Sequence, residues 1–146
     1  INIDTHIDES YVSDESVIIE IHQLINQISN YDSLTKTKNE IEDRFGKISD
    51  KLEIYMYEEW FEKLAKKLDI KNVIQTKTYI EIYLPINISS KINGEKLFLK
   101  LYSINPKFSI RYINKKIIIK LPIINLEKHY LYYLIELLQE IINDIE

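Results

Sequence analysis

The spacing of apolar residues in this chain changes from helix-like to strand-like after about residue 70. Between residues 13 and 68, apolar side chains recur every three or four positions. Between residues 72 and 121, they alternate with polar side chains in several short runs. The first pattern buries one stripe of a helix, and the second buries one face of a sheet. Together they predict a two-layer α+β fold.

Three helices are expected in the first half of the chain, at about residues 13–29, 33–45 and 50–68. Ser13, Ser33 and Ser49 stand at their starts and are good helix-capping residues. In the third helix, apolar residues stand at steps of four: Leu52, Met56, Trp60, Leu64 and Leu68. We interpret Trp60 as a core anchor.

The second half is expected to supply a sheet of four to five mostly antiparallel strands and a long C-terminal helix. The expected strands are residues 1–5, 72–75, 79–84, 107–112 and 116–121, and the helix is 125–145. The clearest hairpin turns at Asn114-Lys115. Residues 93–103 fit a strand or a helix by pattern alone.

The 146 residues are expected to form one domain, residues 1–146, whose start at Ile1 without Met indicates a piece of a longer polypeptide. The absence of cysteine excludes disulfides, thiolate metal sites and cysteine nucleophiles, and fits a cytoplasmic protein. No HExxH, Walker or Ser-His-Asp pattern occurs, and no apolar run is long enough for a membrane span. We expect no catalytic residue, metal or cofactor here.

Charge is unevenly distributed along a chain whose net charge is −4. Residues 1–69 hold 16 acidic and 8 basic side chains, whereas residues 70–124 hold 2 acidic and 10 basic ones. Residues 125–146 are acidic again. Such charges are either neutralised within the fold or presented as opposite faces to different partners.

The stretch 34–46 combines a packed face with a charged one. Ile41 and Phe45 fall on an inward face, while Glu40 and Asp43 share an outward stripe. The glycine that closes the stretch stands where a helix commonly ends in a left-handed residue. Two acids near the carboxyl end of a helix meet the negative end of its dipole, so stability does not explain them. A solvated acidic face and a face that docks on a basic partner both fit.

The same run, Glu40-Ile41-Glu42-Asp43-Arg44-Phe45-Gly46, resembles the Glu-x-x-Asp-Arg-Phe-Gly signature of the C-terminal (TRCF) domain of bacterial transcription-repair coupling factor. Residues 7–14 are similar to the segment before that domain's first helix, and residues 64–70 to one of its helix ends. The resemblance covers about residues 1–75 and continues afterwards only as a pattern. It favours a short helix at residues 93–103. At four positions where the family has Arg, Tyr, Pro and Gly, this chain has Ile18, His22, Ser49 and Asp69.

The resemblance implies a non-catalytic regulatory domain of a larger ATP-driven DNA translocase, which displaces stalled RNA polymerase and recruits nucleotide excision repair. In that family the domain docks on the UvrB-like N-terminal module of the same protein, masks the surface that binds UvrA and restrains the motor. ATP and Mg, and contacts with DNA and RNA polymerase, would belong to the parent protein. Carried over by motif, the docking residues would be Glu40, Glu42, Asp43 and Arg44, with Phe45 and Gly46 supporting the helix end.

An alternative function is nucleic-acid binding by the basic hairpin 107–120. Basic side chains would neutralise phosphates, and exposed aromatic rings would stack on bases. The candidate contacts are Lys107, Arg111, Lys115 and Lys116. Alternation places Phe108, Ile110 and Tyr112 on the opposite face, which favours a sheet whose aromatics face the helices and whose lysines keep the other face soluble.

Overall fold

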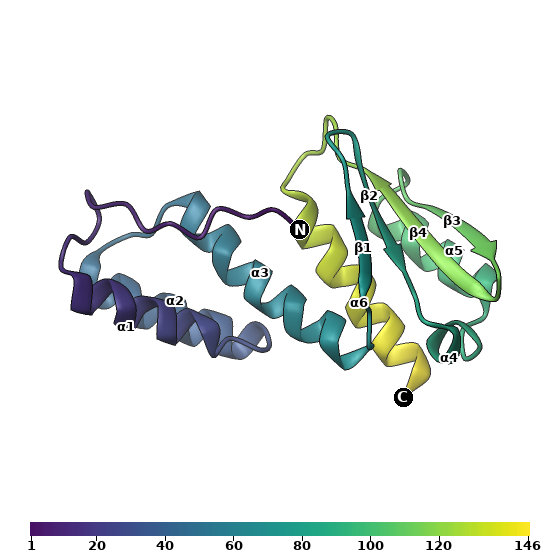
Figure 1. Cartoon of the computed structure of the whole chain (residues 1–146), viewed down its shortest axis with the longest axis horizontal. Coiled ribbons are helices and arrows are strands. Elements are labelled where there is room, and N and C mark those ends of the chain that lie inside the picture. Colours follow the sequence, from purple (N-terminus) through teal and green to yellow (C-terminus); the bar gives the residue numbers. More distant parts are fainter. The chain divides into compact units, whose positions relative to one another are not determined.

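Two units with different secondary structure make up the chain (Figure 1). The computed structural model describes residues 1–146. Residues 2–63 form a helical unit, and residues 64–146, together with Ile1, form a sheet unit. With three N-terminal helices, one antiparallel sheet and a long C-terminal helix, the predicted α+β class is confirmed. The single domain expected over residues 1–146 stays a prediction.

The helical unit contains α1 (Glu15–Asn26), α2 (Tyr31–Phe45) and the larger part of α3 (Asp50–Lys67). The apolar stripes of these helices form its core, because burying them removes apolar surface from water. Its fully buried side chains include Ile21, Ile25, Ile28, Ile41 and Met56. Trp60 is also buried and lies beside the rings of Tyr31 and Tyr57, as expected for a core anchor.

Two of the three predicted helix caps are wrong by a few residues. Asp14, not Ser13, caps α1 by accepting a hydrogen bond from the Ser16 amide. Asn30 caps α2, and Ser33 is the third helical residue, whose hydroxyl accepts a hydrogen bond from the Asn30 amide. This reciprocal arrangement satisfies two amides at once, so it is favoured over a cap at Ser33.

The segment before α1 forms no strand, although alternation at residues 1–5 predicted one. The four strands of the sheet pair only with one another, so this segment has no strand partner. Two buried side chains, Ile7 and Val12, hold it to the helical unit instead. The Lys51 ammonium adds ion pairs with Asp4 at 2.9 Å and Asp8 at 3.6 Å.

The sheet unit is built on four antiparallel strands in the order β1-β2-β4-β3. Their bounds are β1 Asn72–Gln75, β2 Tyr79–Tyr83, β3 Ser109–Ile113 and β4 Lys116–Pro122. The predicted hairpin is confirmed, with positive φ at both Asn114 and Lys115, the conformation of a tight two-residue turn. The inner face carries Ile80, Ile82, Ile117, Ile119 and Leu121, all buried.

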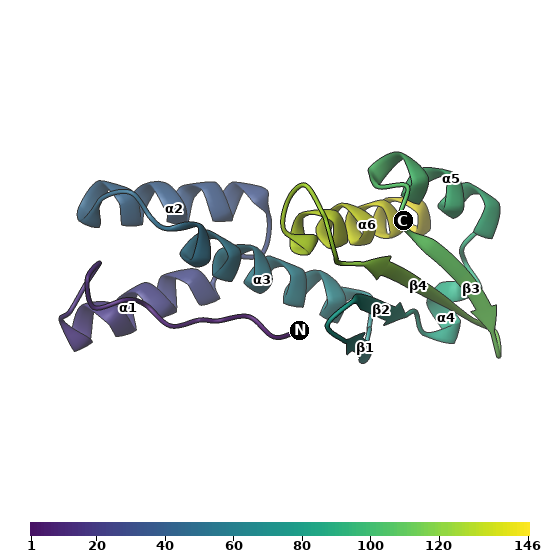
Figure 2. The same cartoon turned by 90° about the horizontal axis from the view of Figure 1, so that it is seen from above.

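Three helices complete the sheet unit. They are α4 (Ile86–Ser89), α5 (Gly94–Ile104) and α6 (Tyr130–Ile145). The helices α5 and α6 lie on one side of the sheet (Figure 2), and α5 confirms the helix favoured at residues 93–103. The closing helix starts at Tyr130 and not near Asn125, because His129 caps it. No helix is long and apolar enough to cross a membrane.

Burial raises the pKa of Glu58 on α3 to about 7, and the nearby carboxylates of Glu62 and Glu59 add to this shift. A carboxyl whose folded pKa lies above its unfolded value of 4.5 stabilises the fold fully below that value. The contribution is lost as pH rises through about 7. We therefore expect Glu58→Gln to flatten the pH dependence of the unfolding free energy between about pH 5 and pH 8.

Urea unfolding of both proteins at several pH values measures this effect. Glu136→Gln, at an exposed position on α6, is the matched control and should follow the unsubstituted protein. Equal pH slopes for Glu58→Gln and the unsubstituted chain would contradict the prediction.

Candidate docking surface on helix α2

Glu40 and Asp43 lie on the exposed stripe of α2, one helical turn apart. Neither carboxylate makes a hydrogen bond or an ion pair within the chain. The opposite stripe packs inward through Leu34 and Ile41, which are buried. Two unpaired acids near the carboxyl end of a helix gain nothing from its dipole. They remain available to a basic surface outside the helical unit.

Glu42 and Arg44, on the same turns of α2, are instead engaged within the helical unit. The Glu42 carboxylate accepts a hydrogen bond from the Ile48 amide at 3.0 Å and so ties the following loop to the helix. Arg44 makes a two-pronged contact with Glu20 of α1, at 2.5 and 3.2 Å. This contact lowers the pKa of the Glu20 carboxyl. The guanidinium also lies 4.8 Å from the centre of the Phe45 ring.

Gly46 ends α2 in a conformation that other residues rarely adopt, with φ of 94° and ψ of 179°. Its amide donates to the Glu42 carbonyl at 2.9 Å. Its carbonyl accepts a hydrogen bond of 2.6 Å from the Tyr11 hydroxyl, and the Tyr11 ring meets the Phe45 ring edge to face. The sequence predicted a left-handed residue at this position; φ is positive as expected, but ψ lies outside the left-handed helical region. Tyr11, which is 35 residues away in sequence, was not predicted to take part.

A second tie joins α2 to α3. The Lys38 ammonium donates to the Glu53 carboxylate at 2.8 Å, with both side chains partly buried. This hydrogen bond is the main reason that the pKa of Lys38 is raised. Because α2 is held at Lys38, Arg44 and Gly46, the direction of its acidic stripe is fixed by contacts along its C-terminal half.

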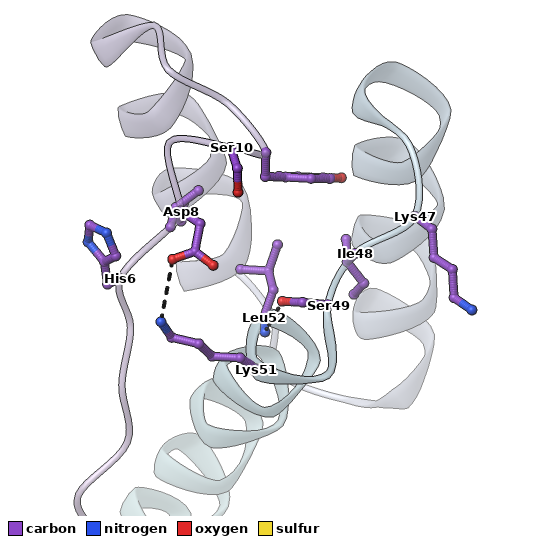
Figure 3. Close-up of a pocket in the computed structure, with 10 residues that line it drawn as sticks. His6, Asp8, Ser10, Lys47, Ile48, Ser49, Lys51 and Leu52 are labelled. Atoms are coloured by element: carbon purple, nitrogen blue, oxygen red, sulfur yellow. Dashed lines mark hydrogen bonds and ion pairs between the residues drawn. The ribbon is translucent and has the colours of Figure 1, made fainter.

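A hollow of about 300 Å³ opens beside this helix end (Figure 3). The segment before α1 forms one wall, with Asp8, Ser10 and Tyr11, and the loop from Lys47 to Ser49 forms the other. The Ser49 hydroxyl accepts from the Leu52 amide at 3.1 Å and caps α3, as predicted. The hollow is large enough to take one side chain from a docked partner.

The four positions that differ from the family signature have local structural roles. His22 packs against Tyr55, with its Nδ1 atom 2.8 Å from the tyrosine hydroxyl. Ser49 caps α3, and Ile18 is half-buried on α1. Asp69 takes a left-handed φ of 56° after α3, which is the conformation a glycine would adopt there.

The basic residues of the hairpin are not brought together as one patch. The Lys107 ammonium donates to the carbonyls of Ile124 and Asn125, and Arg111 pairs with Glu81. Lys115 and Lys116 lie at the turn, where no ion pair holds them. Of the aromatic residues expected to face the helices, Phe108 is buried. Tyr112 is 66% exposed, because β3 is an edge strand.

Comparisons with known proteins by sequence and by structure point to the same family. The TRCF domain family matches residues 1–96, about two thirds of the chain. A structural match with a TM-score of 0.82 and 20% identity is described as "Crystal structure of C-terminal domain of transcription-repair coupling factor". It covers 99% of this chain and 90% of the other. A comparison with curated proteins gives no match.

The fold is therefore that of the C-terminal domain of a transcription-repair coupling factor. The chain belongs to the TRCF domain family of transcription-repair coupling factors, and the resemblance seen in the sequence is confirmed.

The backbone conformation at Gly46 predicts that substituting this residue destabilises the fold. An added Cβ would meet no atom within 4 Å, so the cost of Gly46→Ala is conformational. We expect it to lower the free energy of unfolding by about 1–3 kcal/mol. Gly94→Ala is the matched control, since Gly94 opens α5 without positive φ and also has open space around it. Chemical denaturation should show Gly94→Ala within about 1 kcal/mol of the unsubstituted chain. Equal effects of the two substitutions would contradict this account.

The hydroxyl of Tyr11 can be tested separately from its ring. Tyr11→Phe keeps the edge-to-face contact with Phe45 but leaves the Gly46 carbonyl without its donor. We expect a loss of about 0.5–1.5 kcal/mol in the free energy of unfolding, measured by urea titration. An unchanged transition midpoint would mean that this hydrogen bond does not hold the helix end.

Proposed function

We propose that this chain is the regulatory C-terminal domain of a transcription-repair coupling factor, a DNA translocase that displaces stalled RNA polymerase and recruits nucleotide excision repair. The end of α2 docks on the UvrB-like N-terminal module of the same protein. Docking masks the surface that binds UvrA and restrains the motor. In this proposal ATP and Mg act in the parent motor, the parent contacts DNA and RNA polymerase, and the protein is cytoplasmic.

The observation that carries the proposal is the pair Glu40 and Asp43, exposed and unpaired on a helix end that other contacts hold in place. Exposed carboxylates that make no hydrogen bond or ion pair in their own unit suit a basic surface brought against them. Glu42, Arg44, Phe45 and Gly46 then act as positioning residues, because their contacts lie within the helical unit.

Charge supports the same partner chemistry. Residues 1–63 hold 15 acidic and 6 basic side chains, so the helical unit carries a strong negative surplus. Long-range attraction would therefore favour a basic surface over an acidic one. The hollow lined by Tyr11 and Lys47, just after the end of α2, offers that surface a place to insert a side chain.

The strength of such a contact fits a releasable latch. An exposed acid–base pair contributes about 0–1 kcal/mol, and more when it is desolvated at an interface. Within one polypeptide the two parts meet at high effective concentration, so a few such pairs are enough to keep the latch closed. A competing partner that covers the basic surface would open it.

We expect Glu40→Ala combined with Asp43→Ala to weaken binding of this chain to the separately produced N-terminal module about tenfold, or ~1.4 kcal/mol. The thermal unfolding temperature should not fall, since neither carboxylate makes a hydrogen bond or an ion pair in the chain and the helix dipole disfavours both. Isothermal titration calorimetry measures the affinity.

The matched control is Glu9→Ala combined with Asp32→Ala, which removes the same charge from other exposed positions of the helical unit. It should bind within about twofold of the unsubstituted chain, because only the long-range field changes. If the two double substitutions weaken binding equally, the acidic stripe of α2 is not the docking surface.

A further inference from the structure

The face of the sheet that points away from α5 and α6 differs chemically from the inner face. Pairing of Glu81 with Lys120, and of Tyr83 and Arg111 with Ile118, places these side chains together, opposite Ile80, Ile82 and Ile119. We call it the outer sheet face, defined by Tyr79, Glu81, Tyr83, Arg111, Lys116 and Lys120. In Figure 2 no helix of the sheet unit lies across the middle of this face.

The outer sheet face carries a positive surplus. Glu81 is the one acidic residue in the four strands, and it is 7% exposed and paired with Arg111. Its charge is therefore neutralised within the sheet. Lys116 and Lys120 have no acidic partner. Three further acids of the sheet unit, Glu136, Glu140 and Asp144, lie on α6, so the outer face attracts anions more strongly than the helical side does.

Two aromatic rings accompany this charge. Tyr79 and Tyr83 lie on β2, a central strand, and both are half-buried. Their Cα atoms are separated by about 13 Å, at the usual strand rise. The Lys120 ammonium lies 4.3 Å from the centre of the Tyr79 ring. Tyr83 borders a hollow of about 310 Å³ on the β1 side, which Lys71 and Ile74 also line.

We propose that the outer sheet face binds single-stranded nucleic acid without sequence preference. Tyr79 and Tyr83 each stack on one base, and Lys116 and Lys120 contact the phosphates between and beside them. Aromatic rings on the central strand of an antiparallel sheet, flanked by basic residues, form a surface of this kind. A duplex keeps its bases stacked inside, so it cannot use the rings.

This site shares Arg111 and Lys116 with the predicted hairpin site but has a different centre. Tyr79, Tyr83 and Lys120 take the central places, and Lys107 is excluded because its ammonium is bound to backbone carbonyls. It is also independent of the docking proposal, which concerns α2. Glu40→Ala with Asp43→Ala should leave nucleic-acid binding intact, so failure of one proposal does not imply failure of the other.

The test is fluorescence anisotropy of a labelled oligothymidine of roughly 20 nucleotides, titrated with the whole 146-residue chain at several salt concentrations. We expect binding that weakens with salt. Lys116→Ala with Lys120→Ala should reduce the slope of log affinity against log salt by about 1.4, since each phosphate contact on a single strand contributes about 0.7. The matched control is Lys36→Ala with Lys47→Ala, at exposed positions of the helical unit. This variant should keep the affinity and the salt slope of the unsubstituted chain.

Stacking is tested by Tyr83→Leu and, in a second protein, by Tyr79→Leu. Each keeps apolar volume on β2, and circular dichroism confirms folding. We expect affinity to fall about 5- to 100-fold with the salt slope unchanged, because base stacking does not release counterions. Lack of binding at low salt, equal affinity for duplex, or unchanged affinity of both leucine variants would each overturn the proposal.

Discussion

The carboxyl end of α2 is fixed by a backbone conformation that only glycine adopts easily, and the candidate docking surface depends on it. Gly46 turns the chain with φ of 94°, which brings its carbonyl to the Tyr11 hydroxyl and the following loop to Glu42. Arg44 then reaches Glu20 on α1. These contacts satisfy the polar groups of the helix end, so the fold tolerates two nearby acids that the helix dipole disfavours.

The two units present opposite charges. The helical unit has a surplus of acids, while residues 64–146 hold 13 basic and 8 acidic side chains. Each unit also contains its own ion pairs, such as Arg44 with Glu20 and Lys100 with Asp144. The charges that remain unpaired are therefore negative on the α2 stripe and positive on the outer sheet face. A basic protein surface and an anionic polymer are the partners that these two surfaces fit.

Much of the fold could be predicted because apolar periodicity reports burial directly. It identified the three N-terminal helices and the four strands, and the turn at Asn114-Lys115 fixed the hairpin. Helix starts were less predictable, since Asn30 and Ser33 are both good caps and only their reciprocal hydrogen bonds decide between them. Residues 1–5 show that alternation alone does not make a strand when no partner strand is available.

The candidate sites, like the fold, could be predicted from the sequence only in part. The outward position of Glu40 and Asp43 follows from helical spacing, so sequence was sufficient. The roles of Tyr11 and Glu20 depend on contacts over 35 and 24 residues, which a single sequence does not encode in any local pattern. The outer sheet face was predicted only in part, through Arg111 and Lys116, for a related reason. Its residues come together only because β2 pairs with β4, and these strands are separated by more than thirty residues of sequence.

The most direct test of the central claim is a chemical-shift map of the isotopically labelled chain on adding the unlabelled UvrB-like module. Docking through the end of α2 predicts that the amides of residues 39–49 and of Tyr11 shift most, in proportion to bound fraction. Shifts confined to the sheet unit, with residues 39–49 unmoved, would contradict the account.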